Sequence, residues 1–101
     1  MDLELESGRV IRGATEEDIL SYVEGEDFAI LSTDLNTYIQ CAEQKEPPYE
    51  YILEYQDGSL AAHFWAVDEL ITLDRVLSAF IKYLRGDQSW RADFRWEKME
   101  L

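Results

Sequence analysis

Two kinds of spacing between apolar residues divide the 101-residue chain into elements. Apolar and polar side chains alternate in "LELES", which turns at Ser7-Gly8 into "RVIR". The segments "FAILST" and "NTYIQCA" are rich in residues that favour strands, and they are separated by the turn formers Asp34, Leu35 and Asn36. Each of the two pairs of segments therefore predicts an antiparallel hairpin.

Two other segments have the spacing of amphipathic helices. "TEEDILSYVEG" begins with Thr15 as a possible N-cap, carries acids in its first turn and ends at Gly25, which predicts a short helix. From Thr72 onward one apolar stripe repeats with a period near 3.6, and Gly86 follows it. The stripe consists of Leu73, Val76, Leu77, Phe80, Ile81 and Leu84.

A third hairpin is predicted over residues 49–66, "YEYILEYQDGSLAAHFWA". Asp57-Gly58 favours a two-residue type I′ turn, which fixes the register of the two strands. On one side of this hairpin the register places Glu50 opposite Trp65, Ile52 opposite His63 and Glu54 opposite Ala61. The other side, with Tyr51 opposite Phe64, is predicted to face the core.

The last segment, "WRADFRWEKM", alternates with Trp90, Ala92, Phe94 and Trp96 on one side, which predicts a closing strand. The predicted order is therefore hairpin, helix, two hairpins, helix and strand. This order favours an α+β fold in which two helices pack on one face of a mostly antiparallel sheet. A two-layer sandwich of this size makes a single domain over residues 1–101.

The net charge is −13, from 22 acidic and 9 basic residues. Residues 1–57 hold 15 acids and 3 bases, a net charge of −12, so the acidity belongs to the first half. Such a field repels nucleic acid and anionic lipid and attracts a basic protein partner, although acidity also keeps a protein in solution. No run approaches the roughly 20 apolar residues of a membrane span, and the N-terminus opens with acids, so we expect a cytoplasmic protein that binds no membrane.

Catalytic chemistry has little support in the sequence. The single cysteine, Cys41, shares a strand side with Ile39, which predicts a buried and inert thiol. His63 is the only histidine, and no nucleophile elbow or glycine-rich phosphate loop accompanies it. Glu50, Glu54 and His63 are spaced as any alternating strand would space them, so we expect no metal, no cofactor and no enzymatic activity.

The predicted solvent side of the third hairpin carries an indole, Trp65, among carboxylates. Three interpretations stay open. Another element covers this side and Trp65 is ordinary core, or the side binds a protein partner, or His63 works as a catalytic base oriented by Glu50 or Glu54. The candidate partner-binding residues are Glu50, Glu54, Asp57, His63 and Trp65.

The C-terminal half resembles a group of small immunity proteins from bacterial polymorphic toxin systems. The resemblance covers residues 49–97 and is carried by "YILEYQDG", "LDRVLSAFIKYLRGD" and "WRADFRWEKM", with Tyr55, Asp57, Gly58, Phe80, Gly86 and Trp96 as the shared residues. It implies a stoichiometric inhibitor, without chemistry of its own, that occludes a basic toxin such as a nuclease or deaminase. The alternatives are a small dimeric secretion chaperone or another bacterial interaction protein, and the sequence leaves monomer and homodimer open.

Overall fold

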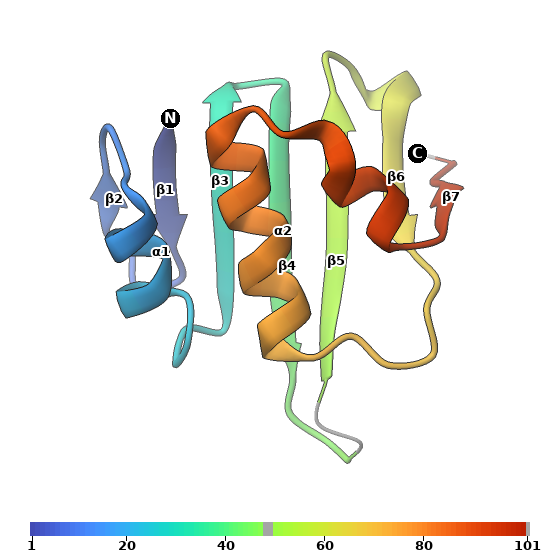
Figure 1. The fold of residues 1–101 in the computed structure, drawn as a ribbon, viewed down its shortest axis with the longest axis horizontal. Coiled ribbons are helices and arrows are strands. Elements are labelled where there is room, and N and C mark those ends of the chain that lie inside the picture. Colours follow the sequence, from blue (N-terminus) through green and yellow to red (C-terminus); the bar gives the residue numbers. More distant parts are fainter. Residues whose placement is uncertain (48–49, 101) are drawn as a thin grey trace.

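The computed structural model describes residues 1–47 and 50–100, which form one seven-stranded antiparallel sheet (Figure 1). The strand order across the sheet is β2-β1-β3-β4-β5-β6-β7. The strands are β1 (Asp2–Leu5), β2 (Val10–Ile11), β3 (Phe28–Asp34), β4 (Thr37–Gln44), β5 (Glu50–Asp57), β6 (His63–Ala66) and β7 (Trp96–Lys98). Strands that follow one another in sequence are neighbours in the sheet, except β2 and β3, which are separated by β1.

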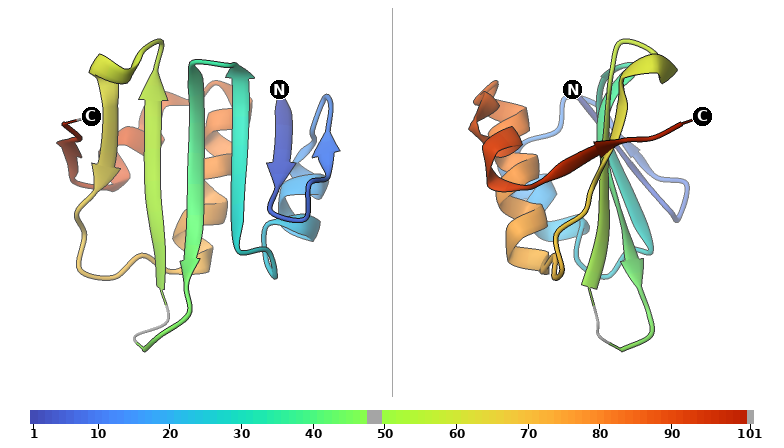
Figure 2. Two further views of the ribbon diagram at one scale, coloured as in Figure 1. Left: turned by 180° about the vertical axis from the view of Figure 1, so that it is seen from behind. Right: turned by 90° about the vertical axis from the view of Figure 1, so that its right-hand side faces the viewer.

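The two α-helices and one of the 3-10 helices of the described residues lie together on one face of this sheet, and none of these three covers the opposite face (Figure 2). They are α1 (Glu16–Tyr22), α2 (Leu73–Arg85) and the 3-10 helix η2 (Gln88–Asp93), while the 3-10 helix η1 (Leu60–Ala62) joins β5 to β6. The predicted α+β sandwich, with two helices on one face of an antiparallel sheet, is confirmed. In the described part of the chain, no helix is long and apolar enough to cross a membrane.

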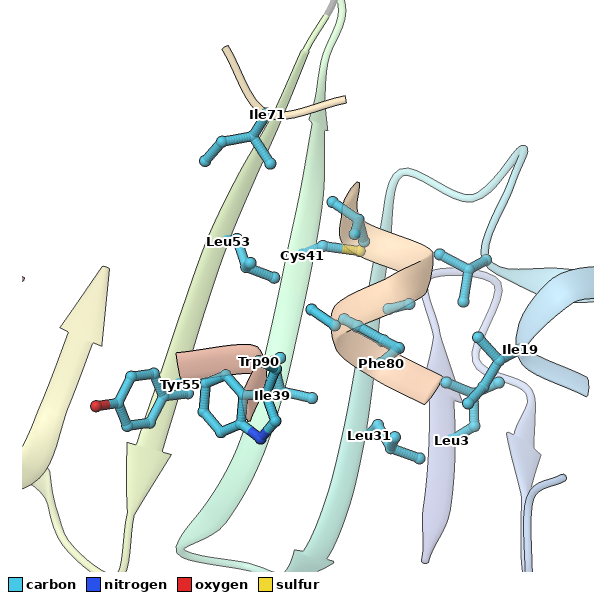
Figure 3. Close-up of a cluster of buried hydrophobic side chains, with 14 of the residues drawn as sticks. Leu3, Ile19, Leu31, Ile39, Cys41, Leu53, Tyr55, Ile71, Phe80 and Trp90 are labelled. Carbon is cyan, nitrogen blue, oxygen red and sulfur yellow. The ribbon is translucent and has the colours of Figure 1, made fainter. Parts of the chain in front are cut away.

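The core fills the space between the helices and the sheet (Figure 3). Phe80 of α2 and Trp90 of η2 are completely buried there, against strand residues such as Leu31 and Leu53. Cys41 is buried on the same side of β4 as Ile39, as predicted. Because strand side chains alternate between faces, these buried positions leave the intervening residues of every strand on the opposite face.

Thr15 and Gly86 act at the helix ends as predicted, but α1 ends at Tyr22, before the predicted end at Gly25. Thr15 forms a capping box with Asp18 at the start of α1, and the Thr72 hydroxyl accepts a hydrogen bond from Arg75 N at the start of α2. Gly86 ends α2 in the left-handed conformation, with φ of 75°. A residue without a Cβ adopts this conformation at little cost, which explains the sharp end of the helix.

The predicted register of the third hairpin is wrong. Trp65 lies opposite Glu54 and His63 lies opposite Gln56, four residues along β5 from their predicted partners. A type I′ turn needs a positive φ at both central residues, but Asp57 is held in the ladder opposite Thr37 and only Gly58 has a positive φ. The chain therefore crosses to β6 through η1. Tyr49, the first residue of the predicted hairpin, lies outside the described residues.

The predicted closing strand is also too long. Residues 88–93 form η2, and only Trp96–Lys98 pairs with β6. Trp90, Phe94 and Trp96 still turn toward the core, but Ala92 is exposed. The helical turn lets Trp90 pack edge-on against Tyr55 at 4.8 Å between ring centroids, a contact that an extended strand does not provide.

Candidate functional site

The sheet face opposite the helices, called the open face below, carries most of the predicted site. One row of cross-strand neighbours crosses it from β1 to β7. The row consists of Glu4, Ile30, Gln40, Glu54, Trp65 and Glu97. Trp65 and Ile52 are 38% and 44% exposed, so no element in the described residues covers them. The interpretation of Trp65 as ordinary core is therefore wrong.

The five predicted partner-binding residues do not form one cluster. Glu54, His63 and Trp65 lie together on the open face. Glu50 lies on the same face at the start of β5, and it lines a hollow together with Trp65. Asp57 lies apart from them, because its carboxylate is 3.4 Å from the guanidinium of Arg91 in the helical layer.

His63 is buried although it lies on the open face; only 4% of it is exposed. Its Nε2 atom is 2.6 Å from Glu54 Oε1, and its Nδ1 atom is 2.9 Å from Gln56 Oε1. Tyr38 OH also donates to Gln56 Oε1, and Gln56 Nε2 donates to the carbonyl oxygen of Asn36. This second bond assigns the orientation of the Gln56 amide, so both ring nitrogens of His63 face acceptor oxygens.

The surroundings of His63 are those of a structural residue. A catalytic base needs a nitrogen that reaches the substrate, and a metal ligand needs an accessible lone pair, but both nitrogens of His63 face side-chain oxygens at 2.6 and 2.9 Å. Residues 1–47 and 50–100 contain no group of three His, Cys, Asp or Glu side chains that could hold a metal ion. Burial and the nearby Glu54 raise the pKa of Tyr38, so this hydroxyl keeps its proton as a hydrogen-bond donor.

Cys41 is on the core side of β4 and does not belong to the site. Burial raises the pKa of its thiol to about 12, although a hydrogen bond with the backbone of Ala29 acts in the opposite direction. A nucleophilic cysteine needs its thiolate form near neutral pH. The buried thiol of Cys41 does not provide it.

A hollow of about 470 Å³ opens beside the first half of β5. Its walls include Glu50, Ile52, Glu54, Trp65, Val67 and Met99. The hollow exists because β6 pairs with β5 only at residues 54–56, after which the chain leaves the sheet along residues 67–71. Tyr51 N donates to Ile71 O at 2.9 Å and fixes the far wall of the hollow.

Ion pairs engage some of the carboxylates on both sides of the molecule. In the helical layer four cations pair with carboxylates: Arg75 with Asp68, Lys82 with Asp93, Arg85 with Glu16 and Arg91 with Asp57. On the open face Asp2 pairs with Arg12, whereas Glu4, Glu50 and Glu97 have no such partner in the described residues. Two of these three carboxylates lie near Trp65, because Glu97 is opposite it and Glu50 lines the same hollow.

Reasoning from the sequence missed Glu4 and Glu97 as members of this face. Glu4 alternates with the buried Leu3 and Leu5, a pattern visible in the sequence. That pattern shows on which side of its strand a residue lies, but it does not show the order of the strands in the sheet. The strand order is what brings residues 4 and 97 into one row. Comparison with known proteins adds no assignment, because no family model, curated protein or solved structure matches the chain.

Proposed function

We propose that this chain is a non-enzymatic binding protein that captures a basic, folded protein partner on its open face. The exposed indole of Trp65, with Glu97 opposite it and Glu50 at the same hollow, neither of them in an ion pair in the described residues, is the observation that carries the proposal. Interface hot spots combine an aromatic anchor with charges that select the partner. Trp65 and Ile52 supply the apolar area, while Glu4, Glu50 and Glu97 supply the charge.

The charge on the open face favours a basic partner over a second copy of the chain. A twofold dimer through this face brings the same surface of two copies together. The carboxylates of one copy then face those of the other, which costs free energy. A basic surface gains from the same carboxylates, and their field accelerates the encounter at low salt.

The resemblance to immunity proteins gives this partner a class. We propose that it is a toxin, such as a nuclease or a deaminase, whose basic cleft the open face occludes in the cytoplasm. Binding alone suffices for such an inhibitor, and the bonded ring of His63 and the buried thiol of Cys41 agree with a chain that has no chemistry of its own. The dimeric chaperone is supported less well, because such a protein needs a large apolar groove and the open face is mainly polar.

Affinity capture with matched charge reversals tests this proposal. The wild-type protein, the variant Glu50→Lys with Glu97→Lys, and the control Glu17→Lys with Glu24→Lys are each used as bait in an extract of the native cells. The control changes the net charge equally but lies in and after α1, on the helical side. A retained candidate is then purified, and its stoichiometry and affinity are measured at low and moderate salt.

We expect a basic protein that binds the wild type and the control one to one. The open-face reversal should weaken this binding at least tenfold and reduce its dependence on salt. Excess wild-type protein should abolish the catalytic activity of the partner. Equal binding by the open-face reversal and the wild type would contradict the proposal, and so would self-association as the only interaction of the chain.

A further inference from the structure

The hollow beside β5 combines apolar walls with carboxylates. Ile52, Trp65, Val67 and Met99 contribute apolar surface, and the side chains of Glu50 and Glu54 lie at the same hollow. Among the described residues that line it there is no Lys or Arg. An uncharged apolar ligand would bury these carboxylates without a partner, which is costly, so the lining favours a ligand with both an apolar stem and a positive charge.

The three carboxylates that line the hollow are not equally available. Asp68 already accepts from Arg75 NH2 and from Arg95 N, both at 2.8 Å. Glu54 uses Oε1 for His63 and for Gln40 Nε2. Glu50 has neither an ion pair nor a side-chain hydrogen bond in the part of the chain that the structure describes. It is therefore the main acceptor for a ligand cation, with Glu54 Oε2 beside it.

The geometry points to an arginine side chain of the basic partner as the ligand of this hollow, an inference that rests on the proposed function. A guanidinium is planar and weakly hydrated, so it stacks on an indole and donates to a carboxylate at the same time. Its three methylene groups match the apolar wall formed by Ile52. A lysine ammonium is more strongly hydrated and does not stack, so it fits the hollow less well.

The probe for this inference is a short synthetic peptide, acetyl-Gly-Arg-Gly-amide. It is titrated into the ¹⁵N-labelled full chain at low salt, and amide and indole shifts are followed by NMR. Two peptides of the same length contain citrulline or lysine in place of arginine. Citrulline has a planar side-chain group of the same shape but no charge, whereas lysine keeps the positive charge but has no planar group.

Binding of the arginine peptide should shift the indole N–H of Trp65 and the backbone amides of residues 50–54 and 65–68. We expect the citrulline peptide to bind at least tenfold more weakly and the lysine peptide a few-fold more weakly. Glu50→Gln and Trp65→Leu should each weaken the arginine peptide about tenfold. The control Glu4→Gln removes the same charge from the same face, but outside the hollow, and should change the affinity less than twofold.

Equal binding of the arginine and citrulline peptides would overturn the inference, and so would equal effects of Glu4→Gln and Glu50→Gln. The failure of the inference is distinguishable from the failure of the proposed function. If the peptides fail but the open-face reversal still abolishes partner capture, the function stands and the arginine site is wrong. If the arginine peptide binds but the reversal leaves partner capture intact, the proposed function is wrong.

Discussion

His63 Nε2 lies 2.6 Å from Glu54 Oε1, in a protein whose only histidine is 96% buried on a sheet face that none of the described helices covers. The second ring nitrogen faces Gln56 Oε1, and the ring of Tyr38 packs edge-on at 6.1 Å between centroids. These side chains from β4 and β5 shield His63 from water, although no helix of the described residues covers this face. The Glu54–His63 contact thus ties β5 to β6 and orients the carboxylate beside Trp65.

Removal of the His63 ring should therefore cost stability. We expect His63→Ala to reduce the free energy of unfolding by about 2 kcal/mol, because it leaves a cavity and removes the ring that contacts Glu54 and Gln56. Urea denaturation at neutral pH measures the loss. Glu97→Ala on the exposed edge strand is the control, with an expected change below about 0.5 kcal/mol. Equal stability of His63→Ala and the wild type would show that the contacts of His63 with Glu54 and Gln56 do not contribute to the free energy of unfolding.

Trp65 and Trp90 should respond differently to the same substitution. Trp90→Ala removes a completely buried ring and is expected to cost about 3 to 5 kcal/mol of unfolding free energy. Trp65→Ala removes a ring that is 38% exposed, so its cost should be less than half as large. Denaturation of both variants under one set of conditions provides the comparison. Equal costs would mean that Trp65 is core, and the open face would lose its anchor.

The side of the sheet on which Trp65 lies could be predicted from the sequence because alternation has a period of two. The predicted register placed Trp65 opposite Glu50, whereas the structure places it opposite Glu54, four residues further along β5. A shift by an even number of residues keeps every side chain on its predicted face of the sheet. The helix α2 could be predicted for a similar reason. Its apolar stripe and its two end signals, Thr72 and Gly86, are local in the sequence.

The features that could not be predicted depend on contacts between distant residues. Asp57 continues the ladder because Thr37 lies opposite, and Gly58 N donates to the carbonyl oxygen of Asn36, so the turn moves beyond Asp57-Gly58. The hollow depends on where β6 stops pairing with β5. Burial of His63 likewise needs Tyr38 and Gln56 from two neighbouring strands. None of these partners is visible in the local pattern.

Asp68 should make stability depend on pH in a defined direction. Burial alone raises its pKa, but hydrogen bonds from Arg95 N and the Arg75 side chain outweigh burial and hold the pKa below the ordinary value of 3.8. A depressed folded-state pKa contributes stability that is present above the ordinary value and disappears as the pH falls through the folded-state pKa. Asp68→Asn should therefore cost about 1 kcal/mol of unfolding free energy near pH 7, and this cost should become smaller as the pH falls below 3.8.

Denaturation of the wild type and Asp68→Asn across this pH range tests the sign. A difference that stays constant from pH 7 to pH 2 would show that the lost interaction does not depend on the charge of Asp68. Glu69→Gln, an exposed neighbour in the same segment, is the matched control and should show little difference at either pH.

Cys41 should be protected from thiol reagents as long as the chain is folded. Its thiol is buried between β4 and the helical layer, and its pKa of about 12 leaves almost no thiolate at pH 8. Because the thiolate is the reacting form, labelling with iodoacetamide should be negligible in the native protein and complete in strong denaturant. Mass spectrometry counts the added groups in each state.

A variant with an added exposed cysteine, Ser78→Cys, provides the control for reagent access, since Ser78 lies on the solvent side of α2. Rapid native labelling at Cys41 itself would show that the sheet opens locally there, and the interpretation of this cysteine as inert core would be wrong.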